Sequence, residues 1–194
     1  MPRVEEADEL LVAQAQRGDA AAFGQLVERY QDALFNGVCR MVSQREDAED
    51  LAQEAFVKAF RGIGAFEGRS SFYTWLYSIA YNVVVSHRRK VGSARHLNPV
   101  SLREGTEGDG RGCEVEDNSE RPDAAVERRE LHERLEQAIA GLEDGYREMI
   151  VMRDIEGFDY QGIAEVLGCP EGTVKSRLHR ARHALREQLK DLLE

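Results

Sequence analysis

Apolar residues recur along most of the chain at intervals of three and four positions, which is the period of an amphipathic α-helix. No stretch alternates steadily between apolar and polar residues, as a half-buried strand would. Three helices are predicted in the first half of the chain over 7–18, over 44–60 and from about Ser71 to about Lys90. A fourth, over 19–42, has its apolar positions on one face, made by Phe23, Leu26, Val27, Tyr30, Leu34 and Val38. The pattern predicts an all-α protein.

The helical pattern stops between Val91 and Ala125. This stretch contains five glycines, two prolines, scattered acidic residues and no aromatic residue. Such a composition buries too little apolar surface to offset the entropy lost on ordering, so a flexible acidic linker is expected. We therefore predict two small helical domains, an N-terminal helical bundle over 1–92 and a C-terminal domain over 127–194, joined by a linker over 93–126.

The C-terminal domain contains the pattern of a helix-turn-helix motif. Ile163, Ala164 and Leu167 give its first helix one apolar face, and the small Ala164 allows a second helix to approach closely. Gly168 can adopt the left-handed conformation that the turn needs, and Pro170 suits the start of the next helix. That second helix has an apolar stripe made by Val174, Leu178, Ala181 and Leu185.

The face opposite this stripe is basic. Five Lys or Arg residues and no acidic residue lie between Gly172 and Arg186. In a helix-turn-helix motif the second helix lies in the major groove of DNA, where Arg and Lys contact guanine edges and phosphates. The candidate DNA-contacting residues are Thr173, Lys175, Ser176, Arg177, His179, Arg180 and His183. A solvated basic face is the simpler alternative, and the two histidines lack a third residue for a metal site.

The formal net charge of the chain is −10, but the charges are unevenly distributed. Residues 171–194 carry 6 Lys or Arg against 4 Asp or Glu, whereas residues 127–170 carry 5 against 11. Because surface charges act over a Debye length of about 10 Å, the local sign decides what a surface attracts. The acidic total therefore does not exclude a nucleic-acid partner.

Other features of the sequence narrow the class of protein. The chain has no apolar run of about eighteen residues, and its acidic start lacks the core of a signal peptide, so a cytoplasmic protein without stable membrane insertion is expected. The cysteines at positions 39, 113 and 169 are odd in number and far apart, which disfavours a disulfide framework or a cysteine-bound zinc. The absence of a metal-ligand cluster, a phosphate-binding glycine loop and an activated nucleophile disfavours an enzyme and predicts no cofactor.

Six of the fourteen aromatic residues lie between positions 66 and 82. On a helical wheel, the predicted helix after Ser71 has a polar stripe bordered by Tyr77, Tyr81 and Arg88. Its opposite, apolar face is made by Phe72, Leu76, Ile79, Ala80 and Val83. Aromatic rings beside hydroxyl, amide and guanidinium groups suit unstacked bases, but tyrosines also commonly fill the border of a core. The residue pattern leaves both interpretations open.

The helix over 44–60 carries an acidic face. Its members are Glu46, Asp47, Asp50, Gln53 and Glu54. Most such faces are solvated, although this one also suits docking to a basic protein surface. A free-standing helix-turn-helix transcriptional regulator is an alternative, which would need a second basic module or a dimerisation face. A protein-interaction adaptor is another, which would not need the basic helix.

Three stretches in this order resemble the extracytoplasmic-function group of bacterial sigma factors. They read DAEDLAQEAFVKAF, FEGRSSFYTWLYSIAYN and IEGFDYQGIAEVLGCPEGTVKSRLHRARHAL, and the resemblance covers residues of about 8–90 and 127–190. It implies a transcription initiation factor that makes no bond of its own. Such a factor binds core RNA polymerase, directs it to promoters and promotes strand opening.

The resemblance also implies a role for each candidate surface. Asp47, Asp50, Gln53 and Glu54 would bind the clamp helices of the largest polymerase subunit, and the C-terminal domain would meet the flap region of the second-largest subunit. Double-stranded DNA of the −35 element would lie against the basic helix. The single-stranded −10 element would be recognised and melted by Arg69, Ser70, Ser71, Phe72, Tyr73, Trp75, Tyr77, Tyr81, Asn82, Arg88 and Arg89, with Lys90 on phosphate. The linker would pass toward the active-site and RNA-exit channels. An anti-sigma factor, whose membrane location stays open, would cover these surfaces.

Overall fold

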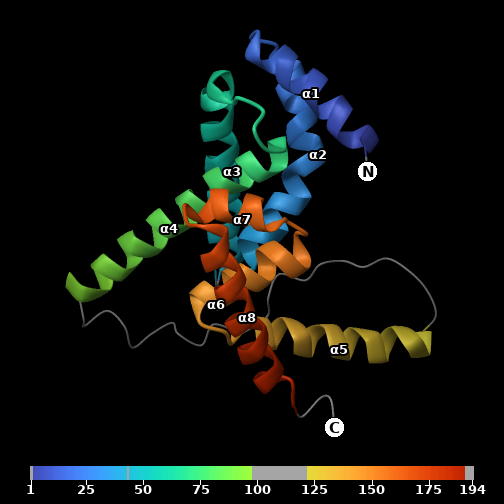
Figure 1. The fold of residues 1–194 in the computed structure, drawn as a ribbon, viewed down its shortest axis with the longest axis vertical. Helices are drawn as coiled ribbons and strands as arrows, with labels where there is room; N and C mark the ends of the chain where they lie inside the picture. Colours follow the sequence, from blue (N-terminus) through green and yellow to red (C-terminus); the bar gives the residue numbers. More distant parts are fainter. Residues whose placement is uncertain (1, 43, 98–121, 191–194) are drawn as a thin grey trace.

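The computed structural model describes residues 2–42, 44–97 and 122–190, and these residues include no strand (Figure 1). The N-terminal half contains α1 (Pro2–Gln16), α2 (Ala20–Cys39), α3 (Arg45–Gly62), the short 3₁₀ turn η1 (Ile63–Ala65) and α4 (Phe72–Leu97). The C-terminal half contains α5 (Pro122–Ala140), α6 (Asp144–Ile150), the π-helical segment η2 (Val151–Ile155), α7 (Tyr160–Leu167) and α8 (Glu171–Gln188). The all-α class predicted from the sequence is confirmed for this part of the chain. None of its helices is both long and apolar enough to cross a bilayer.

Residues at the turns explain where several helices begin and end. Asp19 caps α2, because its Oδ1 accepts hydrogen bonds from the backbone N–H groups of Ala21 at 2.9 Å and Ala22 at 3.2 Å. These donors have no carbonyl partner inside the helix, so the cap satisfies them. Asp159 caps α7 in the same way, accepting from the N–H three residues later at 2.7 Å. Between α7 and α8, Gly168 has a φ of +61°, which is the left-handed conformation predicted for the helix-turn-helix turn.

The core of the N-terminal half lies between α2, α3 and α4. The buried face of α3 is rich in alanine, whose small side chain lets neighbouring helices approach closely. The apolar face predicted for α4 lies in this core, where Phe72, Leu76, Ala80 and Val83 are buried and Ile79 is partly buried. This part of the aromatic-rich segment therefore serves the fold.

Two helices are longer than the sequence pattern predicted. α4 continues past Lys90 to Leu97, and α5 begins at Pro122, so helices occupy both ends of the predicted linker. The prediction that these residues are non-helical is wrong. The extension of α4 contains Ala94 and Arg95, which favour helix, and a glycine within a helix costs only about 1 kcal/mol. Pro122 suits a first helical turn, where its missing N–H has no partner to lose. The predicted flexibility of the rest of the linker concerns residues outside the described ranges.

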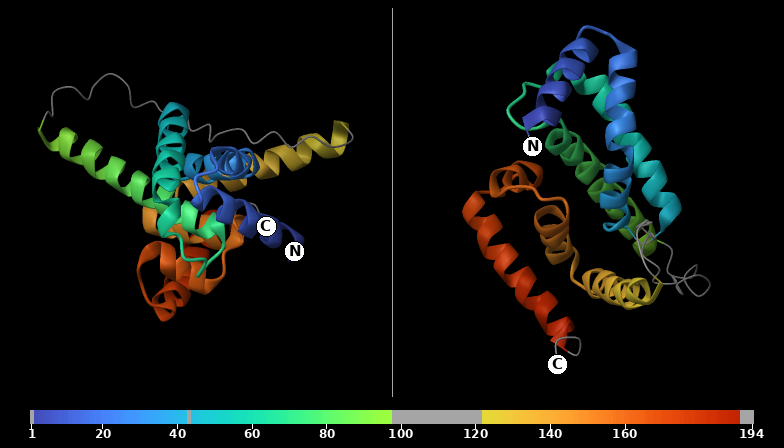
Figure 2. Two further views of the ribbon diagram at one scale, coloured as in Figure 1. Left: turned by 90° about the horizontal axis from the view of Figure 1, so that it is seen from above. Right: turned by 90° about the vertical axis from the view of Figure 1, so that its right-hand side faces the viewer.

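The two halves of the chain pack against each other. α7 lies against α4, and side chains from the α6–α7 segment reach both α4 and the end of α2. Figure 1 shows α7 over α4, and Figure 2 shows the C-terminal helices as a layer beside the N-terminal bundle. The sequence pattern predicted two helical units but did not predict this contact between them.

Candidate functional site

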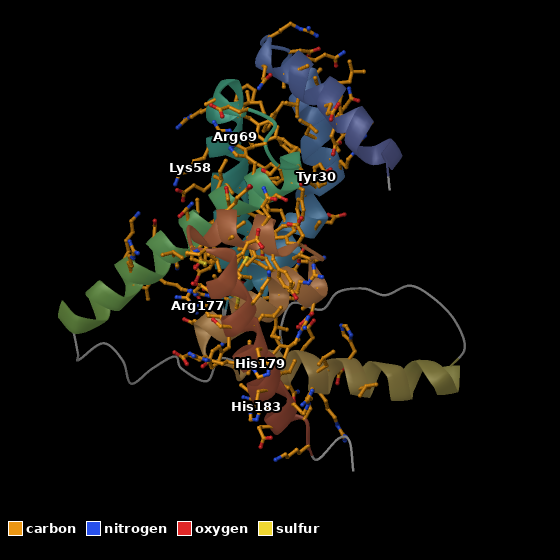
Figure 3. All side chains as sticks on the ribbon, viewed as in Figure 1. Tyr30, Lys58, Arg69, Arg177, His179 and His183 are labelled. Atoms are coloured by element: carbon orange, nitrogen blue, oxygen red, sulfur yellow. The ribbon has the colours of Figure 1, made fainter. Side chains whose placement is uncertain are left out.

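The basic surface of the helix-turn-helix motif is exposed along α8. Val174, Leu178 and Ala181 are buried in the C-terminal core, as the predicted stripe requires. On the opposite face Thr173 is half-buried, and the other candidate DNA-contacting side chains are exposed, namely Lys175, Ser176, Arg177, His179, Arg180 and His183. Figure 3 shows Arg177, His179 and His183 along this helix. Both predicted faces of α8 are thus confirmed.

A shallow basic pocket lies between α7 and α8. It is lined by Tyr160, Lys175, Leu178, His179, Arg182, His183 and Arg186. Lys175 Nζ lies 5.5 Å from the centre of the Tyr160 ring and 3.7 Å from Glu171 Oε2, while Arg182 Nε donates to Asp154 Oδ2 at 3.1 Å. In the described part of the chain no three His, Cys, Asp or Glu residues are grouped so as to hold a metal ion. The pocket suits an anionic or flat group, such as a phosphate or a base edge.

The acidic face predicted on the third helix is present on α3. Asp50, Gln53 and Glu54 are exposed, whereas Asp47 is half-buried with its Oδ2 3.6 Å from His87 Nε2. A hydrogen bond from Lys58, at 2.8 Å, lowers the pKa of Glu54. Beside this face a groove between α2 and α3 is lined by Val27, Gln31, Phe35, Glu49, Ala52, Gln53, Phe56 and Val57. The surface thus combines acidic groups with an apolar floor.

The loop 66–71 is held in place by a residue of the first helix. Gln16 Nε2 donates hydrogen bonds to the backbone oxygens of Ile63 at 3.1 Å and Phe66 at 2.8 Å. At the other end of the loop, Ser71 Oγ accepts from the backbone N–H of Thr74 at 3.0 Å and so caps α4. Sequence reasoning missed Gln16, because its two acceptors lie 47 and 50 residues away along the chain.

The polar side chains around this loop are accessible. Arg69, labelled in Figure 3, has 82% of its side chain exposed and pairs with Glu67. Ser70 is half-buried, and Ser71 is exposed. Trp75 is half-buried, with its ring 5.0 Å from that of Phe66. Further along α4, Asn82 and Arg89 are exposed.

Tyr77 does not lie where its sequence position suggested. The prediction of an exposed polar border at this residue is wrong for this structure, because Tyr77 is 0% exposed. Its ring meets that of Phe158, from the C-terminal half, edge to face with a centroid distance of 4.9 Å. Phe72, another candidate for DNA contact, is a buried core residue.

The neighbouring tyrosines donate hydrogen bonds to two carboxylates of the C-terminal half. Tyr73 Oη donates to Glu156 Oε2 at 2.7 Å, and Tyr81 Oη donates to Glu148 Oε2 at 3.0 Å. Arg88 Nη1 also donates to Glu148 Oε1, at 2.7 Å. The part of the predicted DNA surface made by Tyr73, Tyr77, Tyr81 and Arg88 therefore contacts the protein's own C-terminal half here.

Burial shapes the ionisation of this interface. Burial raises the pKa of Glu156. Burial also raises the pKa of Tyr81 to about 12, and the nearby Glu148 carboxylate contributes to this rise. Burial, with Glu156 nearby, also raises the pKa of Tyr73 and that of Tyr77. The tyrosines are thus neutral donors at physiological pH. The spacing of apolar residues did not predict this set of contacts. Glu148 directly precedes the apolar run Met149–Met152, and an acidic residue beside such a run can indicate a buried partner.

Comparison with known proteins identifies both halves. Residues 26–94 match the family described as sigma-70 region 2, and residues 132–185 match sigma-70 region 4. The first match contains the loop before α4 and most of α4, and the second contains α7 and most of α8.

Relatives match over nearly the whole chain. The RNA polymerase sigma-H factor of Pseudomonas aeruginosa is 39% identical over 97% of each chain. The ECF RNA polymerase sigma factor SigW of Bacillus subtilis is 38% identical over 93% of this chain and 96% of its own. Among solved structures, the sigma factor RpoE of Bartonella quintana, in complex with the anti-sigma factor NepR, is 29% identical with a TM-score of 0.64, covering 87% of this chain and 96% of its own. CnrH, in complex with the cytosolic domain of CnrY, is 28% identical with a TM-score of 0.64, and the match covers 95% of this chain and 98% of its own. The chain belongs to the extracytoplasmic-function family of sigma factors, which act in transcription initiation by RNA polymerase.

Proposed function

We propose that this sigma factor works through three separate surfaces. It binds core RNA polymerase with the acidic face of α3, holds the opened −10 element with the loop 66–71 and α4, and reads the double-stranded −35 element with α8. The observation that carries the proposal is the exposed basic face of α8, which stands beside a turn of helix-turn-helix geometry.

The N-terminal half of α8 supplies the groups that a major groove requires. Lys175 and Arg180 provide cations for guanine edges or phosphates, and His179 provides a ring nitrogen for a base edge. The ion pair between Lys175 and Glu171 is exposed on both sides, and such pairs contribute only about 0–1 kcal/mol. A DNA phosphate can therefore replace Glu171 at little cost.

The loop 66–71 supplies a receiving site for a base that leaves the DNA stack. Such a site needs an aromatic face and polar groups for the open base edge. Trp75 offers the aromatic face, and Ser70 and Ser71, at the end of the loop before α4, offer hydroxyl groups. Arg69 and Arg89 are exposed cations for the neighbouring phosphates. Along the rest of α4 we assign contacts with the opened strand to Tyr73, Tyr77, Tyr81, Asn82 and Arg88.

The face of α3 suits a protein partner. Acidic groups around an apolar floor are typical of a protein interface, and a basic surface would complement them. We assign the clamp helices of the largest polymerase subunit to this face and the flap region of the second-largest subunit to the C-terminal half. Of two similar solved proteins, one is in complex with an anti-sigma factor and the other with the cytosolic domain of another protein. We therefore propose an anti-sigma factor for this chain too. Polymerase binding places the protein in the cytoplasm.

Transcription by purified core polymerase tests the proposal. RNA 5′ ends are mapped on genomic DNA with and without the protein. We expect start sites that appear only with the protein and share two upstream elements. Replacing Lys175 and Arg180 by Ala is expected to reduce initiation there by at least about tenfold, since each base contact is worth about 1–3 kcal/mol.

Lys190→Ala is the matched control for this loss, because Lys190 follows α8 and pairs with Glu187 outside the proposed reading face. We expect it to initiate like the unmodified protein. A complete lack of protein-dependent start sites contradicts the proposed function. Equal losses in Lys190→Ala and the double variant contradict the assignment of the reading face.

A further inference from the structure

We propose that the segment 148–162 is an inhibitory latch that holds the two halves of the free protein closed. In this state the latch occupies the face of α4 that the opened promoter strand requires. The halves must then separate before the protein can hold an open promoter. This inference rests on the proposed function for the assignment of α4 to the −10 element.

The apolar part of the latch is Phe158. Its ring contacts that of Tyr77 at 4.9 Å and that of Tyr73 at 5.6 Å, both edge to face. Phe158 is 7% exposed and Tyr77 is 0% exposed, so no base can stack on Tyr77 while Phe158 stays in place. Aromatic pairs of this geometry are favourable beyond their buried area. The latch and a base therefore compete for the same ring.

The polar part of the latch consists of two carboxylates. Glu148 accepts hydrogen bonds from Tyr81 and Arg88 of α4. Glu156 accepts one from Tyr73, and its Oε1 lies 3.9 Å from Arg40 Nη1 at the end of α2. The partners named here for both carboxylates belong to the N-terminal half. The match of carboxylates to hydroxyl and guanidinium groups makes the closed state specific, because each buried acid needs its own donors.

The same carboxylates take the place of nucleic-acid phosphates. Arg88, which the proposed function gives to the promoter strand, is bound here by Glu148 and lies 3.5 Å from Asp144. Its second guanidinium nitrogen donates to the backbone oxygen of Met41. One guanidinium cannot serve Glu148 and a phosphate in the same geometry. Negative charge on the latch thus excludes the negative strand, whereas the reading face of α8 stays exposed.

The length of a promoter gives an independent reason for opening. The −35 and −10 elements lie about 25 base pairs apart, as their names state, which is about 85 Å of B-form DNA. α8 has 18 residues and is therefore about 27 Å long, and it follows directly on α7, which lies against α4. The closed protein cannot place α8 on one element and α4 on the other.

A disulfide between the halves tests whether closure inhibits. A Cβ at Gly162 of α7 would lie 3.4 Å from Thr74 Cγ2 of α4, which brings cysteines at these positions within bonding range. Thr74→Cys and Gly162→Cys are combined in a parent protein whose three natural cysteines are replaced by Ala, and each single variant is the control. We expect the reduced double variant to direct core polymerase to its start sites and the oxidised form to lose at least about tenfold, because the closed state then cannot open. Equal initiation by both forms, with the bond verified by mass spectrometry, overturns the latch.

Weakening the latch is the second arm, which needs no engineered bond. Phe158→Ala combined with Glu148→Gln removes the ring contacts with Tyr73 and Tyr77 and the charge that pairs with Arg88. It is compared with Leu131→Ala, which removes an exposed apolar side chain of α5 instead. For the free protein we expect the double variant to have a larger radius of gyration by X-ray scattering and to bind single-stranded −10 DNA on the order of tenfold more tightly. Leu131→Ala should match the unmodified protein in both measurements. An unchanged radius and an unchanged affinity in the double variant overturn the latch.

The two arms also separate the latch from the proposed function. If the parent and the reduced double variant both fail to start transcription with core polymerase, the proposed function is contradicted. If they initiate and oxidation has no effect, only the latch is contradicted.

Discussion

At the scale of single residues, Glu156 shows how the closed state depends on its surroundings. Its carboxylate is mostly buried between the two halves, and the cost of burial outweighs the favourable contacts with Tyr73 and Arg40, so its pKa is raised above 4.5. The rings of Tyr73 and Tyr77 and the guanidinium of Arg40 face it from the N-terminal half. In an open protein the same carboxylate would be surrounded by water. The two states therefore bind a proton at Glu156 with different affinity.

We predict that acidification favours the closed state through Glu156. A group whose pKa is raised by closure binds a proton more readily when closed, so its contribution is complete below 4.5 and is lost as the pH rises through the raised value. The closed fraction should thus fall between mildly acidic and neutral pH. Glu156→Gln, which carries no charge at any pH, should remove this part of the slope. The closed fraction of both proteins is measured against pH by X-ray scattering or by fluorescence energy transfer between the two halves. Parallel curves for the two proteins would contradict the assignment to Glu156.

At the scale of elements, the turn between α7 and α8 positions α8, the helix proposed to read the −35 element. Gly168 adopts a φ of +61°, and the N–H of Cys169 donates to the Ala164 carbonyl at 3.1 Å, which closes the end of α7. The buried stripe of α8 then sets which side of the helix faces outward. A change in the turn therefore changes both the stability of the motif and the direction of the basic face.

Gly168→Ala is predicted to destabilise the C-terminal half by about 1–2 kcal/mol, because a Cβ is disfavoured in the left-handed conformation. Gly172→Ala is the matched control. Gly172 lies within α8, has no left-handed φ, and an added Cβ would meet nothing within 4 Å. There Ala is expected to be neutral or to stabilise the helix by up to about 1 kcal/mol. Denaturant unfolding of the three proteins measures the difference, and equal midpoints for both variants would show that the turn is unstrained.

The loop before α4 depends on a different element, α1. Gln16→Ala removes the two hydrogen bonds to the loop, each worth about 1 kcal/mol. We predict a several-fold slower opening of a duplex promoter, because the loop is no longer held ready to receive a base. A template already unpaired at the −10 element should be affected less. Gln14→Ala, on the same helix, is the control, and a loss of equal size on both templates would contradict a role in opening.

At the scale of the whole molecule, the helix faces were predictable and the contact between the halves was not. The period of apolar residues is a local property, so it placed the buried stripe and the basic face of α8 on opposite sides. The same pattern predicted the core face of α4. The burial of Tyr77 is different, because the residue that covers it, Phe158, belongs to the other half of the chain. Periodicity carries no information about which helix faces another across such a distance.

The candidate surfaces also include a part that was predictable from the sequence and a part that was not. The acidic face of α3 and the reading face of α8 follow from composition and spacing on one helix. The latch carboxylates and the Gln16 contacts to the loop depend on long-range packing, as the 47-residue separation of Gln16 and Ile63 illustrates. Spacing along one helix therefore predicts the exposed faces that are proposed to meet partners, whereas it does not predict contacts between distant parts of the chain.

Binding of promoter fragments with and without core polymerase tests the central claim most directly, namely that this protein is a polymerase subunit and not a free-standing regulator. Fragments are taken from the mapped start sites, and their equilibrium binding is measured for the free protein and for its complex with core polymerase. Residues 171–194 have a net charge of only +2, and the latch contacts Tyr73, Tyr77 and Tyr81 of α4. We therefore predict nanomolar binding for the complex and weak or undetectable binding for the free protein. Nanomolar binding of duplex DNA by the free protein would contradict this claim.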